Sequence, residues 1–219
     1  METVPERAGT PLPPQAGEAE EQARADFYAL IARLMLNPPD AALLQNLAAA
    51  ASLPAEDAGN PLDQAWENLV LAATVTDADA VREEFDAMFI SIGTPLVNPY
   101  ASLYLAGFLM EKPLAALRTD LGELGLARLR DSGELEDHLG ALCETMRLLI
   151  AGAHGIAPHP VSVQKAFFQK HIAPWYATCL EHIRGAPGAN FYRRVADFIQ
   201  AFFEVEAQAF EMEVARVAQ

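Results

Sequence analysis

A glutamate, an aspartate and a histidine stand close together in the segment 133–139, in a chain with little other concentrated polar chemistry. Glu134 and His138 are four residues apart, and Asp137 directly precedes the histidine. Two carboxylates and an imidazole could bind a metal ion, transfer a proton or hold a cationic partner. The role of these three side chains is the main functional question that the sequence raises.

The segment is predicted to open a helix that continues to about position 150. On a helical wheel His138 lies at the edge of the apolar stripe, and Glu134 lies one turn earlier on the same side, where the two can pair. Asp137 is expected to point away from the stripe. A purely structural role fits these spacings too, with Asp131 or Ser132 as the cap and the acids at the positive helix end.

The motifs of common metal and catalytic sites are absent from the sequence. A ferritin-like di-iron bundle needs Glu-x-x-His on two helices, and zinc motifs such as CxxC and HExxH do not occur. There is also no glycine-rich phosphate loop and no serine nucleophile elbow. Cys143 and Cys179 lie among apolar residues at helical spacing and are predicted to be buried thiols in a reducing cytosol. We therefore expect neither catalysis nor a bound cofactor.

Composition narrows the class of partner. The chain has 219 residues, of which 52% are hydrophobic, and its formal net charge is −15. Nucleic-acid binding depends on clustered cations, so we expect no nucleic-acid partner. The acidity suits a basic peptide, although it could also serve only to keep an apolar-rich chain in solution. With no apolar run of membrane-spanning length and no secretory signal layout, we expect no membrane span and a cytoplasmic location.

Helical periodicity dominates the chain and no segment alternates with period two. The prediction is an all-α fold, a compact single-domain bundle of about eight or nine helices over residues 19–219. Asp40, Asp63 and Asp77 are expected to open three of the helices. Residues 1–18 are rich in proline, glycine and glutamate and are expected to form a disordered tail.

Aromatic residues lie beside predicted loops and helix ends, where a ring could face a groove. An apolar groove rimmed by carboxylates would suit a segment that is partly hydrophobic and partly arginine. Core packing is the alternative role for each ring taken singly. These residues are Phe85, Phe89, Tyr100, Tyr104 and Trp175.

Three motifs, in this order, resemble those of a known family. Residues 84–89 and 98–104 (NPYASLY) make up the first, 134–139 (ELEDHL) the second, and 167–175 (FFQKHIAPW) with 191–192 the third. Together they resemble the TorD/DmsD/NarJ family of cytosolic chaperones for bacterial molybdoenzymes, over about residues 20–215.

Two positions depart from the family pattern. Leu135 and Asn98 stand where the family usually has proline. The hinge before Asp137 is therefore expected to be less rigid than in the family.

The resemblance implies an all-helical chaperone without chemical turnover. Such proteins bind the N-terminal signal of a molybdopterin oxidoreductase, often a twin-arginine export peptide, and delay export until the molybdenum cofactor is inserted. They also contact the apo-enzyme. Carried over to this sequence, the peptide site would contain Asp137 and His138 with Glu134 beside them, and a neighbouring wall of Pro99, Tyr100, Ser102 and Tyr104.

Several alternatives stay open from the sequence alone. One is a metal-dependent enzyme that uses Glu134, Asp137 and His138 with His171, and another is a helical scaffold without peptide preference. The client enzyme, the binding of a nucleotide or pterin, and the choice between a monomer and a homodimer formed by helix exchange are also open. An unperturbed His138, with a pKa near 6.5, would make peptide affinity depend on pH.

Overall fold

The computed structural model of the chain describes residues 16–51, 59–90, 93–127, 133–153 and 155–217. Over these residues the fold is all-α, as predicted, with ten α-helices, one π-helical turn and no β-strand. The elements are α1 (Ala16–Leu36), α2 (Ala41–Ala48), α3 (Pro61–Val75), α4 (Ala78–Phe85), the π-helical turn η1 (Asp86–Ile90), α5 (Ala101–Ala106), α6 (Lys112–Glu123), α7 (Leu139–Ala151), α8 (Val161–His171), α9 (Tyr176–Gly185) and α10 (Phe191–Val217).

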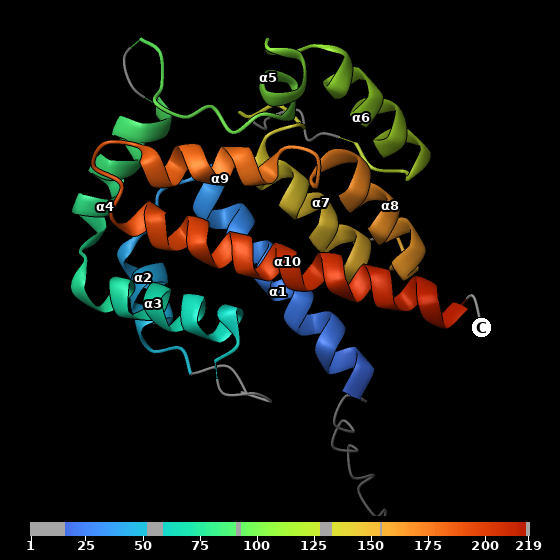
Figure 1. Cartoon of the computed structure of the whole chain (residues 1–219), viewed down its shortest axis with the longest axis horizontal. Helices are drawn as coiled ribbons and strands as arrows, with labels where there is room; N and C mark the ends of the chain where they lie inside the picture. Colours follow the sequence, from blue (N-terminus) through green and yellow to red (C-terminus); the bar gives the residue numbers. More distant parts are fainter. Residues whose placement is uncertain (1–15, 52–58, 91–92, 128–132, 154, 218–219) are drawn as a thin grey trace, which may run out of the picture.

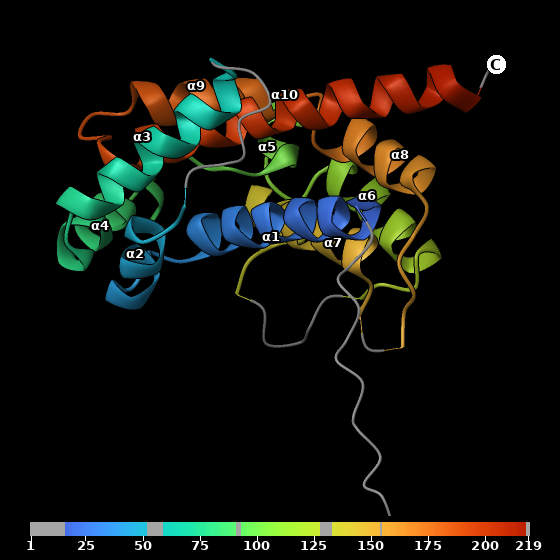
Figure 2. The ribbon, with the colours of Figure 1, turned by 90° about the horizontal axis from the view of Figure 1, so that it is seen from below.

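Two long helices, α1 and α10, organise the bundle (Figure 1). α1 packs most extensively along α7, whereas α10 packs against α3 and α9. Seen from below, α1 and α10 lie in different layers of the molecule (Figure 2). The short α5 packs against α6, and α8 packs against α7. None of the helices in the described ranges is both long and apolar enough to cross a membrane.

Aromatic contacts join the two layers. The ring of Phe27 on α1 lies 5.3–5.5 Å from the rings of Trp66, Phe198 and Phe202, measured between centroids. Such tilted and edge-to-face contacts are the favourable geometry for aromatic pairs. These contacts link α1 and α3 to α10, within a core to which α7 also contributes buried residues.

Gly140 accounts for the close approach of α7 to α1. A β-carbon at this position would lie 2.7 Å from Leu36 Cγ and 3.2 Å from the carbonyl oxygen of Ala32. Any larger residue would push the two helices apart, so glycine is required by packing here.

The expected helix starts are right in two cases and wrong in two. Asp40 and Asp77 cap α2 and α4, because their carboxylates accept hydrogen bonds from the backbone N–H groups of the first turn. Asn60, not Asp63, caps α3. The helix expected to open at Glu134 begins only at Leu139.

At the N-terminus, α1 begins at Ala16, three residues before the expected helix start. The rest of the expected tail, residues 1–15, lies outside the described residues, as do the proposed caps Asp131 and Ser132.

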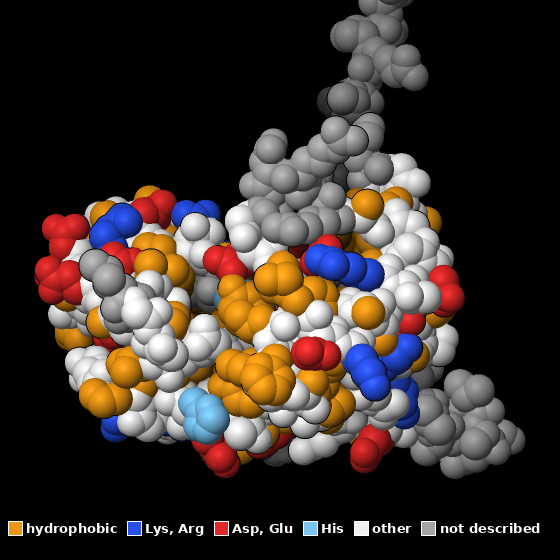
Figure 3. Space-filling model, turned by 90° about the horizontal axis from the view of Figure 1, so that it is seen from above, with side chains coloured by type: hydrophobic (Ala, Val, Ile, Leu, Met, Phe, Trp, Pro, Cys, Tyr) orange, Lys and Arg blue, Asp and Glu red, His pale blue; other side chains and the backbone are white. Residues whose placement is uncertain are grey.

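The face formed by α5 and α6 carries hydrophobic side chains near its centre (Figure 3). Leu105, Phe108, Leu109 and Met110 are exposed there, in α5 and the turn that follows it. On the inside, Cys143 and Cys179 are buried thiols, as predicted.

Candidate functional site

The turn before α7 pairs with the loop before α5. Tyr100 and His138 form an isolated antiparallel bridge. The Ala101 N–H donates to the Asp137 carbonyl at 2.9 Å, and the Leu139 N–H donates to the Pro99 carbonyl at 2.8 Å. Two segments that are more than 30 residues apart in sequence therefore form one rigid junction at the starts of both helices.

Asp137 caps α5 from outside that helix. Its Oδ2 accepts a hydrogen bond from the Ser102 N–H at 2.8 Å and another from the Ser102 hydroxyl. Tyr100, at the N-cap position of α5, makes no side-chain cap of its own. A carboxylate at this end also faces the positive pole of the helix dipole. Asp137 is 1% exposed, so the expectation that it points away from the buried stripe of a helix is wrong.

His138 caps α7. Its Nδ1 accepts a hydrogen bond from the Gly140 N–H at 3.0 Å, which leaves Nε2 as the protonated nitrogen of a neutral ring. Burial lowers the pKa of His138 to about 4, although the charges of Glu134 and Asp137 act in the opposite direction. Residues 134–138 precede the helix, so the expectation that Glu134 and His138 lie one turn apart on the same helix is wrong.

Glu134 and Tyr100 complete the junction. The Tyr100 hydroxyl donates a hydrogen bond to the Glu134 carboxylate. The Tyr100 ring meets the His138 ring edge-on, with centroids 5.0 Å apart and planes at 77°. Burial, followed by the hydrogen bond to Glu134, raises the pKa of the Tyr100 hydroxyl above its usual value. The phenol therefore stays a neutral donor at physiological pH.

An acidic groove of about 230 Å³ opens beside this junction. Its apolar sides come from the end of α1, from α6 and the residues after it, and from α7. Three carboxylates rim it: Glu134 and Glu136 from the turn and Glu144 from α7. The lining residues are Leu36, Leu121, Leu126, Ala127, Glu134, Glu136, Ala141, Glu144, Thr145 and Leu148.

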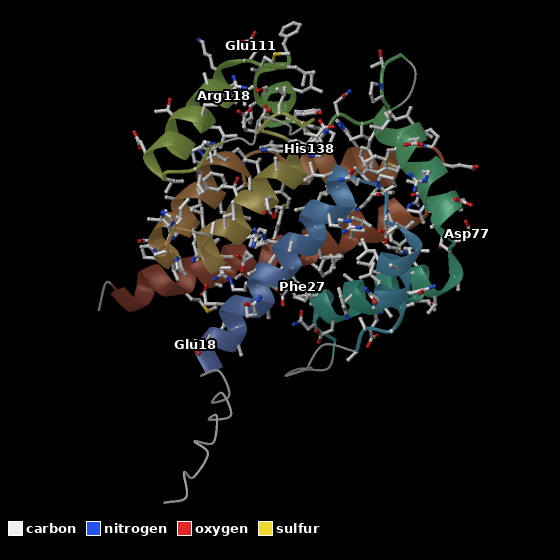
Figure 4. The ribbon with its side chains drawn as sticks, turned by 180° about the vertical axis from the view of Figure 1, so that it is seen from behind. Glu18, Phe27, Asp77, Glu111, Arg118 and His138 are labelled. Atoms are coloured by element: carbon white, nitrogen blue, oxygen red, sulfur yellow. The ribbon has the colours of Figure 1, made fainter. Side chains whose placement is uncertain are left out.

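Two of these carboxylates already hold guanidinium groups in two-point pairs. Arg118 of α6 binds Glu136 at 3.0 and 2.9 Å, and Arg147 binds Glu144 at 2.9 and 2.7 Å. Figure 4 shows Arg118 on α6 near His138 at the start of α7. Glu136 and Glu144 were not singled out from the sequence, because their place at the rim depends on how α1, α6 and α7 pack around the groove.

A second, smaller cavity lies on the other side of the turn. It measures about 200 Å³ and is lined by Asp137 together with mainly apolar residues of α5, α6 and α7, and by Lys170 and His171 of α8. The Oδ1 atom of Asp137 is buried and has no hydrogen-bond partner among the residues that the structure describes. An unsatisfied buried carboxylate oxygen is uncommon and calls for an explanation.

The predicted aromatic residues separate into different clusters. Tyr104 stacks on Trp175 with centroids 5.3 Å apart, and its hydroxyl lies 3.1 Å from His182 Nδ1. Trp175 is 2% exposed and belongs to the core. Phe85 and Phe89 contact each other and Tyr192. Of the predicted rings, Tyr100 is the one in contact with the 134–138 turn.

The metal-site alternative finds no support in the geometry. Within the described ranges, no three His, Cys, Asp or Glu side chains are grouped to hold a metal ion. His171 instead bonds Asp120 of α6 through Nε2 at 2.7 Å. This pair ties α8 to α6, and His171 lines the same cavity as Asp137.

Sequence comparison places the chain in one family. The model of the nitrate reductase delta subunit family matches residues 55–181, more than half of the chain. The chain therefore belongs to this family, which is one of non-catalytic maturation chaperones and was predicted from the three motifs.

The chain is also similar to the "Chaperone protein TorD" of Photobacterium profundum. The two sequences are 24% identical over 131 residues, which is 57% of this chain and 61% of that protein. The chain thus spans less than two thirds of the length of this relative.

Proposed function

We propose that the chain is a cytoplasmic chaperone for a molybdopterin oxidoreductase. It binds the N-terminal, twin-arginine-type signal of that client and assists cofactor insertion before export or assembly. Membership of the nitrate reductase delta subunit family and the similarity to a TorD chaperone support the chaperone role. The single observation that supports signal binding is the acidic groove.

The groove combines the two chemistries that such a signal needs. Leu36, Leu121 and Leu148 offer apolar contact, whereas Glu134 and Glu144 offer carboxylates at the rim. Arginine binds carboxylates through paired, charge-assisted hydrogen bonds that lysine cannot reproduce. Half-exposed pairs such as Arg147–Glu144 contribute little stability, so an arginine of the client can replace the internal partner at low cost.

The sequence-predicted residues then take two kinds of role. We assign direct contact with the signal to Glu134. Asp137 and His138 act as positioning residues, because both are buried and hold the starts of α5 and α7. Pro99, Tyr100 and Ser102 belong with these positioning residues, because they form the junction with residues 134–139. Tyr104, Trp175, Phe85 and Phe89 pack in other clusters, and we assign them no contact with the signal.

The cavity beside Asp137 offers a second contact for the same client. Its volume of about 200 Å³ suits one side chain, and the unpartnered Oδ1 of Asp137 would accept a hydrogen bond from it. A donor entering this cavity would relieve the desolvation cost of that oxygen.

The test is a titration with a synthetic twin-arginine signal peptide. Replacement of Glu134→Gln together with Glu144→Gln removes two charges from the rim and keeps the size of both side chains. We expect the dissociation constant to rise by about tenfold or more, as for the loss of charge-assisted contacts. Glu181→Gln, at an exposed position of α9, is the matched control and should leave binding unchanged. Equal affinity for all three proteins would contradict the assignment.

A further inference from the structure

A larger groove, separate from the acidic groove, runs between α1 and α10. Its volume is about 630 Å³. Phe27 of α1 and Phe202 and Phe210 of α10 provide aromatic surface, and Val205 and Met212 add exposed apolar side chains. In Figure 4, Phe27 and Glu18 mark the part of α1 that borders this groove, away from His138.

The residues that line the α1–α10 groove come from one face of each of the two helices. On α10 the lining residues include positions 202, 205, 206 and 209, and on α1 they include 17, 20, 21 and 24. Both sets follow the i, i+3, i+4, i+7 pattern of one helix face. Each set spans roughly 10 Å of helix at 1.5 Å per residue. A third helix laid between two such faces would bury its apolar stripe against both of them.

The charges along the groove are mainly negative. Glu20, Glu21 and Glu206 line it together with one cation, Arg24. Arg24 is already held by Glu206, with Nε–Oε1 at 2.7 Å and Nη2–Oε2 at 2.8 Å, and by Glu21 at 2.8 Å. The cation is thus neutralised, and the remaining field favours an occupant with positive charge.

We propose that the α1–α10 groove docks an amphipathic helix of a partner protein that carries lysine or arginine along the edges of its apolar face. A second copy of this chain is a poor occupant, because a formal charge of −15 makes two such acidic surfaces repel each other. Glu20 and Leu36 stand roughly 24 Å apart along α1, so the two grooves are distinct sites. A partner that engages both would gain affinity from the linkage.

The experiment uses a synthetic helix of leucine and lysine, with leucine on one face, titrated into the full-length chain. Glu134→Gln and Glu144→Gln are both present in every protein, so that the acidic groove does not dominate the signal. Ala209→Lys places a cation in the α1–α10 groove, whereas Gln208→Lys places the same charge on an exposed neighbouring position. We expect the first change to weaken binding about tenfold and the second to change it less than about twofold.

Five outcomes would overturn the proposal. Equal effects of Ala209→Lys and Gln208→Lys would show binding outside the groove. Equal binding of a leucine–glutamate helix would show that positive charge on the occupant is not needed. Equal binding of a scrambled leucine–lysine peptide would show that an amphipathic helix is not needed. A dimer in sedimentation that Ala209→Lys dissociates would assign the groove to a second copy. Probe binding only after deletion of residues 1–15 would assign it to the chain itself. None of these results bears on signal binding by the acidic groove.

Discussion

The carboxylate of Asp137 accepts hydrogen bonds from Ser102 of α5, so the first effect expected from replacing Asp137 is a loss of folding stability. Asp137→Ala deletes the acceptor for both Ser102 donors and leaves them buried. We expect the free energy of unfolding to fall by about 2 kcal/mol, the usual scale for a lost cap with buried unpaired donors. Urea denaturation at neutral pH measures this change.

A double-mutant cycle with Ser102→Ala separates the cap from other effects of the substitution. If Asp137 acts through Ser102, the two changes should be non-additive by about 1 kcal/mol. Strict additivity would mean that the hydrogen bonds between the two residues contribute nothing to stability.

His138 predicts a direction for the dependence of stability on pH. Its pKa is about 4 in the folded chain and near 6.5 when unfolded. Between these values the unfolded state binds the additional proton, so stability is complete above about pH 6.5 and falls as the pH decreases towards 4. Between about pH 7.5 and about pH 5, the protonation of His138 in the unfolded state should lower the free energy of unfolding by an amount on the order of 2 kcal/mol. Denaturation midpoints across this range measure it.

His138→Asn is the matched variant for this measurement. Asparagine can still cap α7 but does not titrate, so the variant should lose less stability than the wild type over the same pH range. Identical pH profiles would exclude His138 as the source. The same low pKa contradicts the sequence-based idea that peptide affinity follows the protonation of this histidine near pH 6.5.

At the scale of the elements, three helices have N-terminal N–H groups that donate hydrogen bonds to a residue distant in the sequence. α5 is capped by Asp137, and α10 is capped by Glu84 of α4. The Glu84 carboxylate accepts from the N–H groups of Asn190, Phe191 and Tyr192 at 2.9, 3.0 and 2.7 Å. At the start of α7, the Leu139 N–H donates a hydrogen bond to the Pro99 carbonyl. Long-range caps of this kind fix the positions of helices relative to one another.

Glu84→Gln tests the cap of α10. The amide keeps the shape and one acceptor oxygen but loses the charge that faces the helix dipole. We expect the free energy of unfolding to decrease by about 1 kcal/mol, which lowers the midpoint of thermal unfolding. Glu83→Gln, an exposed neighbour on the same helix, is the control and should stay within about 0.5 kcal/mol of wild type.

The sequence predicted the helices well and the junction poorly. Apolar spacing indicated α1, α4 and α10, because amphipathic periodicity is a local signal, and Pro113 indicated the first turn of α6. The start of α7 was wrong because acidic residues commonly occupy a first helical turn. The actual determinant is pairing with residues 99–102, more than 30 positions away, which no local pattern encodes.

Some features of the candidate site were likewise predictable from the sequence, whereas those that depend on contacts between distant segments were not. Glu134, Asp137, His138, Tyr100 and Ser102 do come together, as the family resemblance implied. The burial of the aspartate and histidine, and the rim residues Glu136 and Glu144, depend on how α6 and α7 meet. Phe85 and Trp175 are buried in the core, Phe89 of η1 packs against it, and none of the three lines the groove.

At the scale of the whole molecule, the proposed function has the net charge and the acidic groove acting together on a basic signal. Long-range attraction from a chain of charge −15 should speed encounter, and both this attraction and the contacts at the rim are screened by salt. We expect affinity for a twin-arginine peptide to fall about fivefold between roughly 50 and 500 mM salt. Titrations at several salt concentrations measure this, and a salt-independent constant would mean that apolar contact alone drives binding.

The most direct measurement of the central claim is photo-crosslinking of a twin-arginine signal peptide to the chain, with a benzophenone in the apolar part of the peptide. Mass spectrometry then locates the attachment points. The acidic groove predicts crosslinks at Leu36, Leu121, Ala141 and Leu148, with loss of these products in the Glu134→Gln, Glu144→Gln protein. Crosslinks that gather instead on α3, α4 or α9, and that persist in that variant, would contradict the account.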